Sequence, residues 1–310
     1  MKLSVLDQST AAQGKTQDVA IRETLAYAKR CDELGYHRYW LSEHHNSGNI
    51  VGTAPEVLMA AIAATTPRIR IGSAGVMLPH YSAFKVAEQF RVLEAIAPGR
   101  IDLGVGRAPG SDRLTSMALN PHPDDVHDQF PRQIQELQCW LSGTPLPDGH
   151  PFKRVVAHPT SPTFPTMWVL GSSDYGAQLA AYLGMPYAFA YFFSYGFDVD
   201  KALELYRKNY QPSELHPKPQ CTICVFALAA DTEAEALYQF KPRERALIER
   251  ESGIRQPLMS PEDASARALT PHEQAFSQKL LRHAVVGTAE QVKTRLDELE
   301  KRLDLDELVI

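Results

Sequence analysis

The sequence predicts an α/β protein, a (β/α)8 TIM barrel with insertions after the fourth and seventh strands. The chain has 310 residues, of which 44% are hydrophobic and 22% charged, and this suits a single barrel domain over residues 1–310. Strand-like and helix-like segments alternate from the first residues onward, which indicates parallel strands with helical crossovers. Eight strand candidates favour a closed barrel over an open sheet.

The expected elements are short apolar strands and amphipathic helices. The helix predicted over 18–34 repeats apolar residues at helical spacing, and Gly35 follows it as a C-cap. Pro98 and Gly99 stop the helix predicted over 83–96. The expected strands are 3–6, 39–41, 69–78, 101–105, 167–170, 187–190, 222–229 and 305–310, and the other expected helices are 54–65, 124–141, 174–183, 199–210 and 289–302.

Two segments are longer than ordinary connections. They span about 106–165 and about 230–285, and the second contains two helical stretches. Loops of this length in a compact domain are usually lids or oligomer contacts. The sequence reaches Ile310 inside the eighth strand, so the eighth helix is expected to be absent from it. Either further residues or a neighbouring subunit would then cover that strand.

Composition and charge exclude several classes of protein. The net charge is -5, so the chain lacks the excess of basic residues expected of a nucleic-acid binder. The chain has no signal-peptide pattern and no apolar run of the ~18 residues that a transmembrane helix needs, so we expect a cytoplasmic protein. Cys221 and Cys224 lie in a predicted strand, where residues three apart face opposite ways. No metal or redox site is therefore predicted there.

Polar side chains follow the second strand. Ser42, Glu43, His44, His45 and Asn46 come directly after it, and catalytic groups of barrel enzymes collect at such strand ends. Histidine titrates near neutrality and suits proton transfer, so Glu43 and His44 are predicted catalytic residues. A zinc site is disfavoured because adjacent histidines point apart, and a solvated loop is the simpler alternative.

A glycine-rich stretch follows the fourth strand. It departs from the dinucleotide fingerprint, because the third glycine falls at Pro109 and no helix opens directly afterwards. Gly106 lets a flat ligand approach the backbone, and Arg107 supplies a fixed cation with a fork of donors. The alternative for Arg107 is a structural ion pair.

Gly171, Ser172 and Ser173 follow the fifth strand and open a helix that includes Tyr175. Free amides at a helix N-terminus and two hydroxyls form an anion site, although a plain N-cap would use the same residues. Together the strand ends predict a planar, phosphate-bearing cofactor. The stretch Ser73-Ala74-Gly75 would lie under its rings, because small residues leave room there.

An aromatic cluster would line an apolar substrate pocket or belong to the core: Tyr187, Phe189, Tyr191, Phe192, Phe193 and Tyr195.

At these residues the chain resembles the bacterial luciferase-like family of flavin monooxygenases, in its alkanal monooxygenase-like branch. Four motifs in order carry the resemblance, at 42–45, 71–79, 98–107 and 170–173. The resemblance implies a homodimeric flavin barrel. Reduced FMN, delivered as a co-substrate by a separate NAD(P)H-dependent flavin reductase, would act with O2 to oxidise a small organic substrate.

The resemblance also implies roles for individual residues. Ala74–Gly75 would be a cis peptide behind the flavin ring, and His44 would be the acid/base. Arg107, Ser172 and the turn through Tyr175 would hold the phosphate. Luciferases have a reactive cysteine at the position of Gly106 and an acidic residue at that of Gly171. These departures disfavour light emission from a long-chain aldehyde.

Two other functions remain open from the sequence. The related deazaflavin-dependent oxidoreductases share the barrel and transfer hydride, and the acidic tail of their cofactor would require extra cations at the barrel mouth. A non-catalytic flavin-binding barrel is the second alternative, which the presence of Glu43 and His44 disfavours.

Overall fold

Eight parallel strands close a barrel in the order β1-β10-β7-β6-β5-β4-β3-β2. The structure is a computed structural model that describes residues 1–108, 110–121, 126–193 and 199–310. The predicted fold class is therefore confirmed. The barrel strands are β1 (Lys2–Asp7), β2 (Arg38–Leu41), β3 (Arg70–Met77), β4 (Ile101–Gly106), β5 (Thr166–Gly171), β6 (Tyr187–Phe189), β7 (Cys221–Cys224) and β10 (Glu307–Val309).

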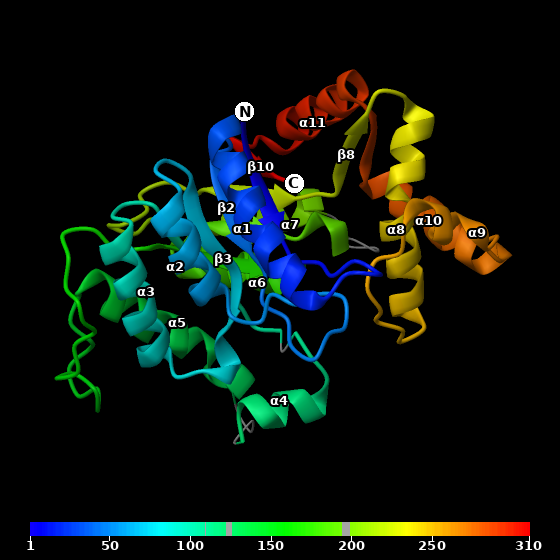
Figure 1. Cartoon of the computed structure of the whole chain (residues 1–310). Helices are drawn as coiled ribbons and strands as arrows, with labels where there is room; N and C mark the ends of the chain where they lie inside the picture. The colour runs from blue at the N-terminus through cyan, green and yellow to red at the C-terminus, as the bar shows by residue number, and fades with distance from the viewer. Residues whose placement is uncertain (109, 122–125, 194–198) are drawn as a thin grey trace.

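Helices surround the barrel as crossovers between its strands (Figure 1). Their ends follow the capping residues in the sequence: Gly35 closes α1 in a left-handed conformation, and Ser82 caps α3 through the amide of Lys85. No helix in the described part of the chain is long and apolar enough to cross a membrane. The crossover helices are α1 (Gln17–Leu34), α2 (Pro55–Thr65), α3 (Ala83–Ile96), α5 (Val126–Ser142), α6 (Asp174–Tyr182), α7 (Val199–Lys208) and α11 (Ala289–Leu303).

The first insertion joins β4 to β5 and contains α5 together with a short helix, α4 (Arg113–Leu119), which the sequence pattern did not predict. Asp112 caps α4 by accepting a hydrogen bond from the amide of Thr115. In Figure 1, α4 lies at the bottom of the view, on the side of the barrel away from the N-terminus. That side is where the barrel strands end.

The predicted seventh strand over 222–229 is wrong as a single element. Its first part is β7 of the barrel, whereas β8 (Ala227–Ala230) pairs with β9 (Val285–Thr288) in a separate two-stranded parallel sheet. The reason is that the partner of β8 lies more than 50 residues downstream, where a local apolar pattern gives no information.

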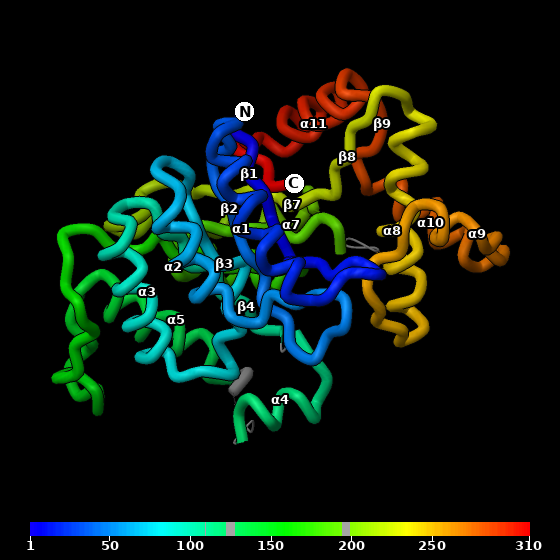
Figure 2. The backbone as a smooth tube through the Cα atoms, viewed as in Figure 1, coloured from blue at the N-terminus to red at the C-terminus, as the bar shows by residue number. Residues whose placement is uncertain are grey.

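Three helices, rather than the expected two, lie between β8 and β9: α8 (Glu233–Glu251), α9 (Pro261–Ala266) and α10 (Pro271–His283). We call them the α8–α10 lobe, and Figure 2 shows it beside the barrel, away from α3 and α5. The lobe is tied to the loop after β1. The amide of Leu258 donates to the carbonyl of Ala11 at 2.8 Å, and the carbonyl of Leu258 accepts from the amide of Gln13 at 2.7 Å.

The N-terminal end of the barrel is filled by a buried ion cluster. Arg38 of β2 donates to Glu307 of β10 at 2.8 Å and to Asp102 of β4 at 2.7 Å, and Arg70 of β3 reaches Asp102 at 2.5 Å. A pair of indoles lies next to this cluster, since the Arg38 guanidinium is 5.0 Å from the ring centroid of Trp168. These groups close one end of the barrel and leave its free space at the other.

We expect Asp102→Asn to lower the free energy of unfolding by about 3–5 kcal/mol, because it breaks a buried ion cluster and leaves guanidinium charge uncompensated. Burial alone would raise the pKa of Asp102, but Arg38 and Arg70 hold that pKa below its usual value. The carboxylate's contribution is thus present above the unfolded pKa of about 4 and is lost as the pH falls through the lower folded pKa.

Urea unfolding followed by circular dichroism at several pH values measures this effect. The wild type should lose stability more steeply below pH ~4 than the Asp102→Asn variant. Asp148→Asn, which changes an exposed carboxylate, serves as the control and should leave the slope unchanged. Equal slopes for the wild type and Asp102→Asn would contradict the prediction.

Candidate active site

A cavity of about 740 Å³ lies at the C-terminal ends of the barrel strands. Its size falls within the range of ~300–1,000 Å³ typical of ligand and cofactor sites. Trp40 of β2, Leu170 of β5 and Val309 of β10 line its inner part, next to the aromatic layer of the barrel. The cavity also brings together ten of the eleven predicted site residues: Glu43, His44, Ala74, Gly75, Gly106, Arg107, Gly171, Ser172, Ser173 and Tyr175.

Ser73 is the predicted residue that does not line this cavity. Its side chain is fully buried, and its hydroxyl donates to the carbonyl of Gly104 at 3.0 Å. The pairing of β3 with β4 shifts register between Ser73 and Val76. The hydroxyl therefore belongs to the barrel wall, and a direct contact with a ligand is not available to it.

Ala74 and Gly75 form a flat, close-packed part of the cavity wall. The peptide bond between them is cis, as the resemblance implied. A Cβ atom on Gly75 would lie 2.5 Å from Leu170 Cδ1 and 2.7 Å from the carbonyl oxygen of Gly104. Only glycine fits between these neighbours, so the close packing of this part of the wall against β4 and β5 depends on it.

The ends of β4 and β5 form a site suited to an anion. The guanidinium of Arg107 lies 4.0 Å from the ring centroid of Tyr175, and among the described residues it forms no ion pair. Ser173 is the N-cap residue of α6 but makes no side-chain capping bond, so its hydroxyl remains available. These groups and the first amides of α6 can bind a phosphate.

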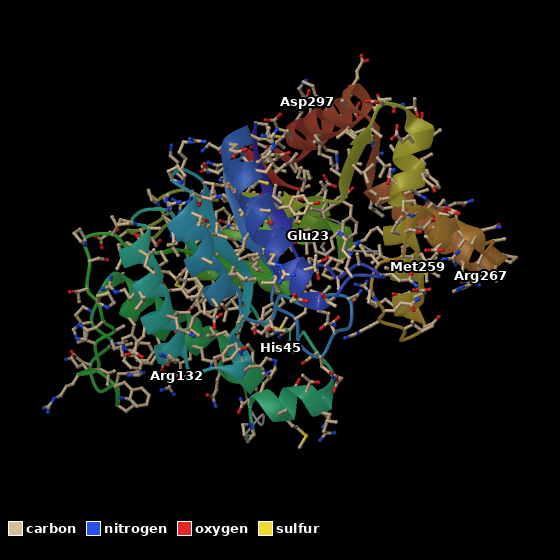
Figure 3. The ribbon with its side chains drawn as sticks, in the orientation of Figure 1. Glu23, His45, Arg132, Met259, Arg267 and Asp297 are labelled. Atoms are coloured by element: carbon tan, nitrogen blue, oxygen red, sulfur yellow. The ribbon has the colours of Figure 1, made fainter. Side chains whose placement is uncertain are left out.

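Glu43 holds the loop after β2. Its buried carboxylate accepts hydrogen bonds from Tyr81 Oη at 2.6 Å, His45 Nε2 at 2.7 Å and the amide of Met77 at 3.2 Å. In Figure 3, His45 lies on the side of the barrel that faces α4. Both oxygens of Glu43 are thus engaged in hydrogen bonds that join the loop after β2 to Met77 and Tyr81.

The imidazole of His44 borders the cavity, with Nδ1 3.3 Å from Ser42 Oγ. Burial lowers the pKa of His44 to about 4, and the positive charge of Arg255 contributes to the same direction. The ring is therefore neutral at neutral pH. It can accept a hydrogen bond or a proton through one nitrogen and donate through the other.

A second cavity of about 290 Å³ lies beside the first, and Gln8, His44 and Phe193 border both. Arg243 and Arg250 of α8 and the nearby Arg255 also line it. Sequence reasoning missed these arginines. Arg243 and Arg250 are seven residues apart, a spacing that places both on one face of a helix, but nothing local indicates that this face meets the barrel mouth.

The predicted aromatic cluster is divided between cavity and core. Phe189, Phe192 and Phe193 line the main cavity. The ring of Tyr187 packs against Tyr206, and that of Tyr191 against His283, whereas Tyr195 lies outside the described residues.

The two cysteines of the C-x-x-C sequence are free and lie on opposite sides of β7. Cys224 lines the cavity, whereas the Sγ atom of Cys221 accepts a hydrogen bond from the guanidinium of Arg207 at 3.3 Å. Within the described ranges, no group of three or more His, Cys, Asp or Glu side chains could hold a metal ion.

The fold and the site define a closed parallel barrel with a ligand-sized cavity at the strand ends, and comparison with known proteins identifies the family. A family model described as luciferase-like monooxygenase matches residues 1–305. The chain therefore belongs to the luciferase-like monooxygenase family, a family of oxygen-incorporating enzymes.

Two relatives of known sequence match along almost their whole length. A luciferase-like monooxygenase of Escherichia coli (strain K12) is 39% identical over 99% of this chain and 90% of its own. The N-acetyl-S-alkylcysteine monooxygenase of Bacillus subtilis (strain 168) is 37% identical over 100% of this chain and 92% of its own.

Solved structures share the fold. Apo-MsnO8 is 33% identical, with a TM-score of 0.89 over 99% of this chain and 91% of its own. The oxygenating constituent of 3,6-diketocamphane monooxygenase from Pseudomonas putida, in complex with FMN, is 18% identical. Its TM-score is 0.71 over 100% of this chain and 91% of its own. An F420-dependent secondary alcohol dehydrogenase is 14% identical, with a TM-score of 0.67 over 99% of this chain and 92% of its own. The last two of these neighbours bind FMN and F420, respectively, and they are similar to this chain in fold alone.

We expect the imidazole of His44 to titrate near pH 4, because burial and the charge of Arg255 disfavour its protonated form. Arg255→Gln should raise the pKa of His44 toward its ordinary value of about 6.5. Nitrogen-15 NMR of labelled imidazoles measures both titrations, and Arg154→Gln on the distant first insertion is the control. A wild-type midpoint at or above the ordinary value would refute this assignment.

Proposed function

We propose that this protein is an FMN-dependent two-component monooxygenase, which uses reduced FMN and O2 to oxidise a small organic substrate. One observation carries the proposal. A single cavity is bordered by the neutral His44, the flat wall at Ala74–Gly75 and the anion site at Arg107 and Ser172.

The residues at the cavity fit the shape and charge of FMN. Arg107, Ser172, Ser173 and the amides that open α6 would hold the phosphate, and the wall at Ala74–Gly75 would receive the planar ring. When bound in reduced form, the flavin supplies the electrons with which O2 oxidises an organic molecule.

The protein's side chains would have distinct roles around the bound flavin. His44 would accept a proton or a hydrogen bond from the reacting molecule, because its ring is neutral and borders the cavity. Glu43 would keep His44 in place through its bonds to Tyr81 and Met77. The apolar inner wall would exclude water from the reaction.

The small organic substrate is proposed from one relative's activity. Because a protein 37% identical along the whole chain is named an N-acetyl-S-alkylcysteine monooxygenase, thioethers of this class are the first substrates to test. A separate NAD(P)H-dependent flavin reductase would deliver the reduced FMN.

The proposal includes a homodimer that acts in the cytoplasm. Val57 of α2 and Val92 and Ile96 of α3 are exposed apolar residues on two helices that pack together. Val92 and Ile96 are four residues apart and share a helix face. Such a surface is suited to contact with a second copy of the chain.

Hydride transfer with a deazaflavin is the second candidate, and the arginines at the mouth favour it. The deazaflavin cofactor carries an acidic tail, which cations such as Arg250 and Arg255 could bind. However, Arg107, Ser172 and Tyr175 do not border the cavity that contains these arginines. Because the acidic tail extends from the phosphate, the FMN proposal accounts better for the arrangement.

Anaerobic titration with photoreduced FMN and with reduced deazaflavin separates the candidates. We expect reduced FMN to bind in the micromolar range or tighter. With a flavin reductase, 18O2 and an N-acetyl-S-alkylcysteine, one labelled oxygen atom should enter the product. Preference for deazaflavin would replace the proposal with the second candidate, and flavin binding without turnover of any substrate would support a non-catalytic barrel.

We expect Arg107→Gln to weaken FMN binding by about tenfold or more, because a charge-assisted contact to phosphate contributes roughly 1.5–3 kcal/mol. Riboflavin, which lacks the phosphate, should bind the variant and the wild type equally. Fluorescence titration measures both affinities. Arg113→Gln, an exposed arginine of α4, is the control, and an equal loss for riboflavin would show that Arg107 does not contact the phosphate.

A further inference from the structure

The smaller cavity, of about 290 Å³, is formed where the α8–α10 lobe meets the barrel mouth. Gln8 follows β1, His44 follows β2, and Phe193 follows β6, and these three residues also border the main cavity. The two cavities are therefore neighbours, and His44 lies at their boundary.

The lining of this cavity is strongly cationic. Arg243, Arg250 and Arg255 contribute three guanidinium groups, and no Asp or Glu is present among the described lining residues. Glu249, next to Arg250 in the chain, accepts a hydrogen bond from Gln256 Nε2 at 2.9 Å and does not line the cavity. Among the described residues, Arg250 and Arg255 form no ion pair, and their positive charge therefore favours an anionic ligand.

Contacts with aromatic rings and with the barrel hold these arginines in place. The Arg250 guanidinium lies 5.4 Å from the ring centroid of Phe193, and that of Arg243 lies 4.3 Å from Phe226 and donates to Gln8 at 3.3 Å. A guanidinium over an aromatic face keeps its edge N–H groups available for a carboxylate. The segment with Arg255 is docked by the two backbone bonds of Leu258 to the loop after β1.

We propose that Arg250 and Arg255 bind the carboxylate of an anionic substrate, whose apolar part passes Phe193 and reaches His44 in the main cavity. This inference rests on the proposed function and adds a substrate class to it, namely organic acids with an apolar body. The distribution of side chains supports the orientation, because the cations line one cavity and the apolar wall lines the other.

The same chemistry could come from the acidic tail of a deazaflavin. The phosphate site at Arg107 and Ser172 borders the main cavity but not the smaller one. A tail that continues from the phosphate would therefore start away from the arginines. A substrate that approaches from the lobe would meet them first.

Matched acids and amides test the inference. The probes are N-acetyl-S-benzylcysteine and 4-phenylbutyrate, each with its primary amide, which keeps the shape and removes the charge. Calorimetry on the full chain, with and without oxidised FMN, measures their affinities. We expect each acid to bind at least about tenfold more tightly than its amide, since hydrogen bonds to charged groups are the stronger ones.

Arg250→Gln and Arg255→Gln should each weaken acid binding by about tenfold and leave amide binding unchanged. Arg154→Gln removes the same charge from the exposed first insertion and should change neither. The FMN affinity and thermal unfolding of each variant establish that it is folded, so a lost acid preference would then be specific to the arginines.

Several results would overturn the inference. They are equal affinity for acid and amide, binding of neither at millimolar concentration, and an acid preference that survives both arginine substitutions. Weaker binding of reduced deazaflavin in the variants, with acid affinity unchanged, would assign the arginines to a cofactor tail instead. Failure of the wild type to bind reduced FMN is measured separately and rejects the proposed function, whatever the acids do.

Discussion

The buried ion cluster around Arg38 is the constraint on which the rest of the barrel depends. One guanidinium joins β2 to Asp102 of β4 and Glu307 of β10 across the barrel interior, and such charges are tolerated in a protein interior only when they are paired. Trp40 and Trp168 pack against each other beside it, with ring centroids 5.3 Å apart. With this end filled by ions and indoles, the interior space that a ligand can use lies at the C-terminal ends of the strands.

At that open end, the loops supply two separate cationic sites. The ends of β4 and β5 supply the cation and amides of an anion site around Arg107, and the α8–α10 lobe supplies the cations around Arg250 and Arg255. His44 lies where the two cavities meet, and burial together with the nearby arginine charge lowers its pKa to about 4. A neutral imidazole between two cationic sites fits an enzyme that binds an anionic cofactor and an anionic substrate around one reacting centre.

Seven of the eight barrel strands and the crossover helices were predicted to within a few residues, because apolar periodicity and caps such as Gly35 are local signals. Most of the candidate site was predicted for a related reason, since strand ends of a parallel barrel converge. Ser73 does not line the cavity, because its side chain is buried in the barrel wall and bonds to Gly104, and periodicity alone does not reveal such a contact. The strand predicted over 222–229 was misassigned because β9, which is far away in sequence, decides the pairing of β8.

The sequence by itself determined the fold class, the order of the elements and the positions of His44, Arg107 and Ser172 at strand ends. These features follow from residue type and spacing along the chain. Only the tertiary structure decided that the carboxylate of Glu43 is fully engaged and that Arg250 and Arg255 face the barrel mouth. The physical reason is that burial, hydrogen-bond partners and neighbouring charge depend on distances in space, which residues far apart in the chain set together.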